Sequence, residues 1–423
     1  MSGEIITLER YTKCEYTPAG SNRSEDVVFN PLKLIIEEGI STNYEGRLTV
    51  WTDKVCKQDK LKELLDTSIS ISITQEIDGA EFFTDVPTQK RFFHGIITHV
   101  KSSGPIVVTN SISYFLYEII IESVLAPLKY TRKTKDYKAT LPNKIIESIL
   151  TYYNINADFT FFTSKETPIT ILGQFDCSDY SFIQSLLSMY GISFAWTHPD
   201  INDENSQIAG LLFNNGSSFP APILTYTGDI EGPLDDVYEF DCLASTYDRE
   251  EETSVWKMDA WTMENSIGVD RMELTSFYPI GNKALKTWIA DRSEATKTRF
   301  FQYARMFHGY LPNATTEKID ADIKAILDTR KVITDGQKIK WKGQTSNLCI
   351  IPGANFRLKN YYGADDDNLI SGLVTKSTLT ANAPWPTSTL GSPPGGINGA
   401  ASVLINFSAV DWGNESNKRY CAM

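Results

Sequence analysis

The sequence predicts a mainly β protein with α+β insertions, built from two β-barrel domains and a small α/β domain. The chain has 423 residues, and its aromatic share is 12%, with 20 Tyr and 21 Phe. Aromatic side chains suit half-buried pleated sheets, so this composition favours strands. Short apolar or alternating runs, punctuated by Gly, Asn, Asp and Pro, fill two long stretches, as expected for serial strands. Two amphipathic helices lie between these stretches.

The chain divides into four predicted segments. Residues 1–130 form the first β-barrel domain, residues 131–210 the small α/β domain, and residues 211–383 a second β-barrel domain with a helical insertion. Residues 384–423 form a linker rich in Pro, Gly and Ser, followed by a strand, VLINFSAV. The first domain has its strands in VVFNPLKLIIEEG, YEGRLTVWTD, TSISISITQEI, RFFHGIITHV and YEIIIESVL. The alternation in TSISISI predicts a strand with one face in water.

Both helices of the α/β domain are predicted from apolar residues at helical spacing. Pro142 and Asn143 open the first helix, whose buried face consists of Ile145, Ile146, Ile149, Leu150 and Tyr153. Asp176 or Ser178 caps the second helix and Gly191 follows its end. Its apolar stripe consists of Phe182, Ile183, Leu186, Leu187 and Tyr190.

The helical insertion of the second barrel is predicted to run from Thr316 to Val332 and to end before a turn at Asp335-Gly336. Its buried face consists of Ile319, Ile323, Ile326 and Leu327. The runs QKIKWKG, NLCII, NFRLKN and LISGLVTKSTL then predict closing strands.

The formal net charge of −13 argues against nucleic-acid binding as the main task. Ten acidic residues fall in one window, 229–252: Asp229, Glu231, Asp235, Asp236, Glu239, Asp241, Asp248, Glu250, Glu251 and Glu252. Basic residues gather at Lys129, Arg132, Lys133, Lys135 and Lys138. Each group is either a solvated face or one half of a charge-complementary contact between copies of the chain or with a partner.

The cysteines and the N-terminus indicate a protein made in the cytoplasm. The six cysteines form no CxxC pair and are typical of reduced thiols. The N-terminal residues lack the apolar core of a signal peptide. No run reaches the ~20 apolar residues of a membrane helix, so we expect no stable membrane insertion. We therefore expect any delivery out of the cell, or into a target cell, to use a route without a signal peptide.

Catalytic and metal-binding motifs are missing from the sequence. His94 and His99 lie five apart in a predicted strand, so they point to opposite faces and cannot share a metal. Asp365, Asp366 and Asp367 are consecutive, and the alternating Asp200, Asn202 and Glu204 lack the Gly and the final Glu of a calcium loop. We expect no catalytic, cofactor-binding or metal-binding residues and no enzyme activity. A hydrolase with a carboxylate pair that converges only in the fold stays open as a less favoured alternative.

The segment QFDCSDYSFIQSLLSMYGISF resembles the most characteristic stretch of the VgrG family, the spike proteins of type VI secretion. The matching positions are Gln174, Phe175, Ser178, Asp179, Phe182, Ile183, Leu186, Leu187, Gly191 and Ile192. Other family motifs are similar to RFFHGII from Arg91, to the strand Tyr117–Leu128 and to PGANFRL from Pro352. Asn406, Phe407 and Ala409 are loosely similar to the strand before the spike. The motifs occur in family order from about residue 5 to 412.

The resemblance implies a hub of the phage tail type. It implies two barrels per chain, with three chains in a pseudo-sixfold ring that adapts the hexameric tube, Hcp in secretion systems, to the membrane-puncturing spike. The implied partners are two further copies, the Hcp-type hexamer, an OB-fold and needle spike with its PAAR tip protein, and baseplate proteins. No cofactor is implied. The sequence departs from the family at Met423, where the OB-fold is expected, and at Tyr361–Asn368. A stand-alone baseplate hub of a contractile phage tail or extracellular injection system is therefore the alternative.

Overall fold

The structure is a computed structural model of the chain. It describes residues 6–10, 14–16, 25–76, 88–109, 112–155, 157–158, 169–190, 193–198, 210–214, 225–227, 237–241, 256–257, 260–266, 271–277, 285–291, 301–305, 315, 317, 320–321, 324, 327, 338–348, 350–359, 370–384 and 402–411.

A 14-stranded sheet dominates the described part of the chain, with the order β1-β6-β7-β8-β5-β4-β23-β22-β15-β16 along its main path. Off this path, β14 pairs with β7, and β24 lies between β23 and β21, which in turn pairs with β17. These strands are β1 (Ile6–Arg10), β4 (Asn30–Gly39), β5 (Glu45–Thr52), β6 (Ser68–Glu76), β7 (Thr88–Thr109), β8 (Ile112–Glu122), β14 (Thr225–Thr227), β15 (Val237–Asp241), β16 (Trp256–Lys257), β17 (Ala260–Asn265), β21 (Ile339–Thr345), β22 (Asn355–Lys359), β23 (Ile370–Asn382) and β24 (Ser402–Asp411). The mainly β class predicted from the sequence is confirmed.

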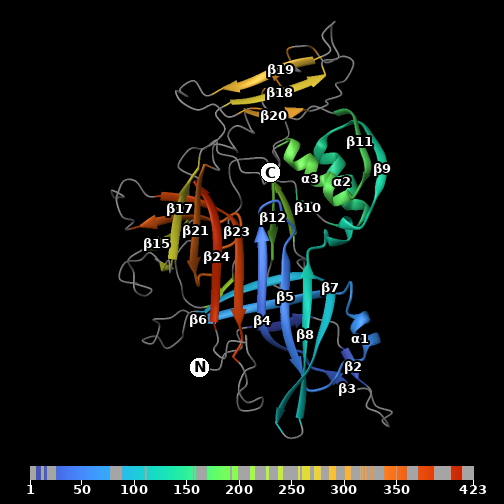
Figure 1. Cartoon of the computed structure of the whole chain (residues 1–423), viewed down its shortest axis with the longest axis vertical. Coiled ribbons are helices and arrows are strands. Elements are labelled where there is room, and N and C mark those ends of the chain that lie inside the picture. The colour runs from blue at the N-terminus through green and yellow to red at the C-terminus, as the bar shows by residue number, and fades with distance from the viewer. Residues whose placement is uncertain are drawn as a thin grey trace.

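The pair β4·β23 joins the N-terminal and C-terminal parts of this sheet. It is antiparallel, and its register runs from Lys33 opposite Asn382 to Gly39 opposite Lys376. Figure 1 shows β4 and β5 beside β23 and β24, although the two pairs come from opposite ends of the chain. We call the β4·β23 junction the seam. Strands from both predicted β-barrel segments are thus hydrogen-bonded in one sheet.

The remaining elements form smaller units around the large sheet. The helices whose bounds the structure describes are α1 (Gln58–Glu63), the 3₁₀ helix η1 (Ala126–Lys129), α2 (Pro142–Tyr152) and α3 (Asp179–Tyr190). The smaller sheets contain β2 (Cys14–Tyr16), β3 (Glu25–Val27), β9 (Lys133–Thr140), β10 (Ala157–Asp158), β11 (Ile169–Cys177), β12 (Ser193–Thr197), β13 (Gly210–Asn214), β18 (Arg271–Phe277), β19 (Leu285–Asp291) and β20 (Phe301–Arg305). Figure 1 shows α2 and α3 beside the curved ribbon of β9 and β11.

Both predicted helices of the α/β segment are confirmed. The apolar residues of α2 that are buried are Ile145, Ile146, Ile149 and Leu150, and those of α3 are Phe182, Ile183, Leu186 and Leu187. Ser178 is the N-cap of α3, because its Oγ accepts a hydrogen bond of 3.1 Å from the backbone N–H of Ser181. The side chain of Tyr190 and all of Gly191 lie outside the described residues.

The end of α2 follows the Schellman pattern. The N–H of Asn154 donates to the carbonyl of Thr151, and the N–H of Ile155 donates to that of Leu150. Asn154 takes the left-handed conformation, with φ of 56°, that this ending needs. Asparagine tolerates such a φ better than most residues, so the sequence ends the helix here.

The prediction of one wet face for β6 is wrong. Ile69, Ile71 and Ile73 are buried as expected, but Ser70 and Ser72 are buried as well. Ser70 Oγ lies 2.9 Å from Nδ1 of His94, so its hydroxyl has a buried polar partner instead of water. Serine alternation therefore marks a polar layer inside the protein here.

The remaining sequence predictions have mixed outcomes. Glu317, Asp320, Ala321, Lys324 and Leu327 are helical, and Leu327 is buried, which agrees with the predicted insertion helix. Its other predicted core residues and the Asp335-Gly336 turn lie outside the described residues, as do Tyr361–Asn368 and most of the linker. The predicted strand in NLCII is wrong, because Leu348 and Ile350 are buried in an irregular loop. The strand in VLINFSAV is β24, which pairs with β21 and β23.

Candidate functional site

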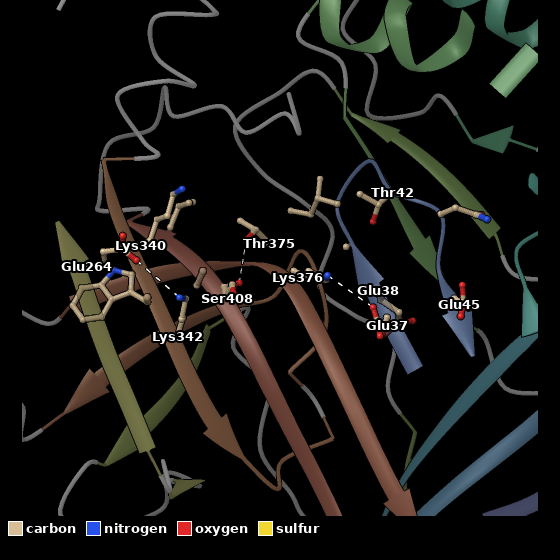
Figure 2. Close-up of a pocket in the computed structure, with 16 residues that line it drawn as sticks. Glu37, Glu38, Thr42, Glu45, Glu264, Lys340, Lys342, Thr375, Lys376 and Ser408 are labelled. Atoms are coloured by element: carbon tan, nitrogen blue, oxygen red, sulfur yellow. Dashed lines mark hydrogen bonds and ion pairs between the residues drawn. The ribbon is translucent and has the colours of Figure 1, made fainter. Parts of the chain in front are cut away.

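An open groove of about 650 Å³ lies at the seam, where β4, β23, β24, β21 and β17 come together. We call it the seam groove, and Figure 2 shows the side chains around it. It is lined by Glu37, Glu38, Gly39, Ile40, Thr42, Asn43, Glu45, Glu264, Lys340, Trp341, Lys342, Thr375, Lys376, Ser408, Ala409 and Val410. Residues from both ends of the chain therefore build one surface feature.

One wall of the seam groove is the turn between β4 and β5, which the α/β segment holds in place. Gln184 of α3 donates from Nε2 to the carbonyl of Ser41 over 3.0 Å. Trp196 of β12 donates from Nε1 to the carbonyl of Thr42 over 3.0 Å. Ser41 itself has a left-handed φ of 57°, so these contacts hold a turn that a serine adopts rarely. The wall is consequently a fixed part of the fold.

The floor of the seam groove is an irregularity in β23. The pairing of β23 with β24 shifts between Val374 and Lys376, so Thr375 is the extra residue of a β-bulge. The carbonyl of Thr375 accepts a hydrogen bond of 2.9 Å from the N–H of Ile40, which ties the bulge to the turn. Thr375 Oγ1 donates to the carbonyl of Ser408 over 3.1 Å. The bulge therefore joins the floor to the first wall.

Exposed charges of both signs line the groove (Figure 2). Lys376 Nζ lies 3.9 Å from Glu37, and Lys342 Nζ lies 4.0 Å from Glu264. All four side chains are between 46% and 67% exposed. Ion pairs of this length and exposure contribute little to stability. Lys340 is also exposed, and no acidic side chain is within ion-pair distance of it among the described residues.

A buried ionic cluster lies behind the groove, on the opposite face of β4. Glu38 forms an ion pair with the guanidinium of Arg91 from β7, and both side chains are almost fully buried. His198 Nε2 lies 3.2 Å from Glu38 Oε1, at an angle outside that of a normal hydrogen bond. His198 Nδ1 accepts a hydrogen bond of 3.1 Å from the N–H of His94, so the imidazole proton resides on Nε2 when His198 is neutral.

The cluster sets the ionisation of Glu38. Burial by itself raises the pKa of this carboxyl, but the charge of Arg91 and the nearby His198 imidazole outweigh that effect and lower the pKa to about 2. Glu38 is therefore ionised at neutral pH although it is buried. Because burial and the Glu38 charge both disfavour a phenolate, the pKa of Tyr44 lies well above its usual value. The cluster is a fixed charged core beneath the groove.

The Gln174 and Asp179 motif positions are explained by a second buried cluster. The Asp179 carboxylate accepts hydrogen bonds from Gln174 Nε2 over 2.9 Å and from Tyr153 Oη over 2.6 Å, and Lys133 Nζ lies 2.9 Å away. Burial raises the pKa of Asp179, but these hydrogen bonds prevail and hold it below its usual range. The same contacts raise the pKa of Lys133 against the opposing effect of burial. The cluster fixes the start of α3 on β9 and β11.

The glycine and turn motifs also have steric causes. A Cβ on Gly95 would lie 2.5 Å from Ile121 Cγ2 and 2.8 Å from the carbonyl oxygen of Glu122, so the RFFHGII strand requires glycine there. Pro352 and Gly353 form a turn in which the N–H of Ala354 donates to the carbonyl of Ile351. Gly353 has φ of 96°, as the third residue of a type II turn requires.

The candidate residues for chemistry do not come together. The prediction that His94 and His99 face opposite ways is wrong, because the pairing of β7 with β8 shifts between Ile97 and His99 and the strict alternation does not hold there. The two side chains differ in burial instead: His94 is buried and His99 is exposed. Among the described residues, no three His, Cys, Asp or Glu side chains are grouped closely enough to hold a metal ion. His308, Asp200, Asn202, Glu204 and Asp365–Asp367 lie outside the described part of the chain. Within that part, no helix is long and apolar enough to span a membrane.

The basic residues at 129–138 have two different roles. Lys129 pairs with buried Glu122, and Lys133 pairs with buried Asp179, so these two lysines neutralise interior carboxylates. Lys135 and Lys138 are exposed. Arg132 forms a pair of 3.2 Å with Asp176, with both side chains mostly in solvent. Sequence reasoning missed the Glu38 and Asp179 clusters. Arg91 lies far from Glu38 in the chain, and Lys133 lies far from Asp179, so no local pattern links either pair. Gln174 and Asp179 belong to one motif, but the motif alone does not indicate their hydrogen bond.

Comparisons with known proteins give a family match over part of the chain and a fold for the whole of it. Residues 37–217 match the model of the family described as phage tail baseplate hub (GPD). No curated protein matches the chain by sequence. Among solved structures, the chain is similar to the E. coli c3393 protein, a component of the type VI secretion system with structural similarity to the T4 bacteriophage tail proteins gp27 and gp5. The TM-score is 0.55 at 14% identity, over 98% of this chain and 79% of that chain.

A second similar structure is a chain of the lidded Francisella PdpA–VgrG complex, with a TM-score of 0.52 at 12% identity. That match covers 99% of this chain and 54% of the Francisella chain, so this chain spans about half of that relative. At these identities the structural likeness establishes the fold. The chain therefore has a VgrG-like tail-hub fold, with the part that matches the phage tail baseplate hub (GPD) family at residues 37–217.

Proposed function

We propose that this chain is a structural hub of a contractile injection machine, in which three copies form a pseudo-sixfold ring between a hexameric tube and a threefold spike. The seam is the observation that carries this proposal. It joins strands of two β-rich parts of one chain in a single sheet. A chain with two such units offers six units in a trimer, which is the number that a hexameric Hcp-type tube presents.

The proposed partners are two further copies of the chain, the tube hexamer, baseplate proteins, and a spike with its PAAR tip. In this role the hub is assembled in the cytoplasm and leaves it with the machine. The work is mechanical, and the proposal assigns no catalysis to the chain. A ring of this kind needs obligate interfaces of roughly 2,000 Å² or more in total.

The test is the assembly state of the full chain, alone and with a purified Hcp-type hexamer. Sedimentation velocity over a wide concentration range should show monomer and trimer as the populated species. Electron microscopy of the mixture should show a ring with threefold symmetry stacked on the hexamer. A dimer or tetramer that persists at all concentrations would contradict the proposal.

The alternative is a stand-alone baseplate hub of a contractile phage tail or extracellular injection system. The family match favours it, since the matching family is described as a phage tail baseplate hub. The two proposals assume the same fold and differ in the tube protein that the hub binds. Binding of the full chain to a phage-type tail tube, with no binding to the Hcp-type hexamer, would favour this alternative.

A further inference from the structure

Four acidic and three basic residues line the seam groove, but two of the acidic residues are paired with arginines outside it. Glu38 is neutralised by Arg91 behind the groove, and Glu45 is paired with Arg47 at 2.7 Å. Three lysines then remain in the groove: Lys340, Lys342 and Lys376. Among the described residues, Lys376 lies 3.9 Å from Glu37 and Lys342 lies 4.0 Å from Glu264. In a chain of net charge −13, this groove has a surplus of exposed cationic groups.

The pairs in the groove can exchange partners at small cost. Their nitrogen–oxygen distances are at the limit of an ion pair, and the side chains are about half exposed or more. Such pairs contribute about 0–1 kcal/mol, because the charges are screened and the side chains lose freedom when they pair. A ligand with several carboxylates could displace Glu37 and Glu264 and also pair with Lys340.

Strand β17 at the rim of the groove is also suited to an interface. Five of its six residues are exposed, including Met263 and Glu264, although they alternate between both faces. A strand normally buries at least one face. Among the described residues, β17 pairs with β21 alone, so one edge of its backbone has no strand beside it there. An exposed strand edge offers unpaired backbone groups with which a segment of another chain can pair.

We infer that the seam groove and β17 receive the end of the acidic window, residues 248–252, of a second copy of the chain. An earlier part of that window, Val237–Asp241, is β15, which pairs with β22 and β16 in the chain's own sheet and is not the part that docks. The acidic segment 248–252 has four carboxylates and one basic residue, Arg249, so its net charge is opposite to that of the groove lysines. Contact between two different surfaces of the same chain is head-to-tail, and head-to-tail contacts can close into rings. The inference rests on the proposed ring and assigns two surfaces to its interface.

The test is a charge-swap experiment on the full chain, read by sedimentation velocity. One variant combines Lys340→Glu, Lys342→Glu and Lys376→Glu, and a second combines Glu250→Lys, Glu251→Lys and Glu252→Lys. Each variant alone should weaken self-association by about tenfold or more, because like charges then face each other. The sextuple variant should recover most of the association. Salt should weaken association of the natural chain as well.

The control combines Lys62→Glu, Lys101→Glu and Lys144→Glu, three lysines that are also well exposed and also lie near single acidic residues. This control changes the net charge by the same amount and should leave association within about twofold. Thermal unfolding of every variant checks that the fold is retained.

The outcomes separate this inference from the proposed function. Natural self-association that the groove variant does not change would overturn the groove assignment and leave the ring intact. A weakened groove variant without recovery in the sextuple variant would overturn the acidic segment as the occupant. Absence of self-association at every concentration, with and without the tube hexamer, would contradict both the ring and this inference.

Discussion

Glu37 and Glu38 are neighbours on β4, but they belong to two different regions of the molecule. Glu38 points inward, is 5% exposed and belongs to the cluster with Arg91 and His198. Glu37 points into the seam groove, is 46% exposed and lies at the limit of an ion pair from Lys376. Because side chains alternate along the strand, Glu38 forms a buried ion pair on which the fold depends, and Glu37 forms an exposed ion pair whose lysine can change partner. Charge in the interior of this protein is therefore structural, and charge in the groove is available for partners.

The largest expected effect on the free energy of unfolding comes from the buried Glu38 cluster. Arg91→Met removes the guanidinium and leaves Glu38 buried without its main counter-charge. Breaking a buried ion pair in this way costs about 3–5 kcal/mol, because the remaining charge is desolvated and unpaired. Urea unfolding should show a loss of this size in the free energy of unfolding.

The matched change in the groove is Lys376→Met, which also removes a cation from a glutamate but should cost less than about 0.5 kcal/mol. Adding Glu38→Gln to Arg91→Met should recover part of the lost stability, since the buried charge is then gone. A loss below about 1 kcal/mol for Arg91→Met would show that Glu38 is solvated, contrary to its burial.

The second prediction concerns the loss of folding stability at acidic pH. The pKa of Glu38 is about 2 in the folded chain against an ordinary value of 4.5. Because the folded-state pKa is the lower one, the stabilisation is fully present above about pH 4.5 and is lost as the pH falls toward 2. Linkage gives a loss on the order of 3 kcal/mol from this group. Unfolding measured between pH 6 and pH 2 should show it.

The variant Glu38→Gln should flatten this part of the pH profile, since the amide does not titrate. Glu37→Gln is the matched control and should leave the profile as it is in the natural chain. A Glu38→Gln profile as steep as the natural one would assign the acid sensitivity to other carboxyls.

The third prediction has an intermediate effect and concerns the cluster at the start of α3. Asp179→Ala removes one of the two acceptors of the buried Gln174 amide, which keeps only the carbonyl of Cys177, and it also removes the counter-charge of Lys133. An unsatisfied buried polar group costs about 1–3 kcal/mol. Thermal unfolding should show a loss in this range, whereas Asp176→Ala, which removes a nearby exposed carboxylate, should have little effect. Equal losses for the two variants would contradict the assigned role of the cluster.

The sequence predicted those parts of the fold that depend on local patterns. Spacing of apolar residues was sufficient for α2 and α3, and Ser178 and Asn154 act at their ends as helix-end chemistry requires. The strands of the first β-rich segment were found in the same way. Local patterns were less reliable where burial comes from distant partners. Ser70 of β6 is buried with His94 of the neighbouring strand as its polar partner, and nothing in TSISISI indicates this.

The candidate site could not be predicted in this way. The seam groove combines the turn between β4 and β5 with lysines from the C-terminal part of the chain, and their proximity follows from the β4·β23 pairing. QKIKWKG was recognised as a strand, but its lysines had no assigned partner. Gln174 and Asp179 were recognised as motif positions by resemblance. Their hydrogen bond explains why these residue types occur together, and the irregularity in the β9·β11 pairing that follows Gln174 is not visible in the sequence.

The smallest expected effect on the free energy of unfolding comes from the exposed ion pairs of the seam groove. Lys342→Ala and Glu264→Ala should each change the free energy of unfolding by less than about 0.5 kcal/mol, and their coupling in a double-mutant cycle should be close to zero. A coupling above about 1 kcal/mol would mean that the groove charges stabilise the fold as the Glu38 cluster does. Near-zero coupling has a further consequence, because a Lys342–Glu264 pair that adds nothing to folding can be broken without unfolding the chain. Any loss of assembly in the groove variants would then report on the interface itself.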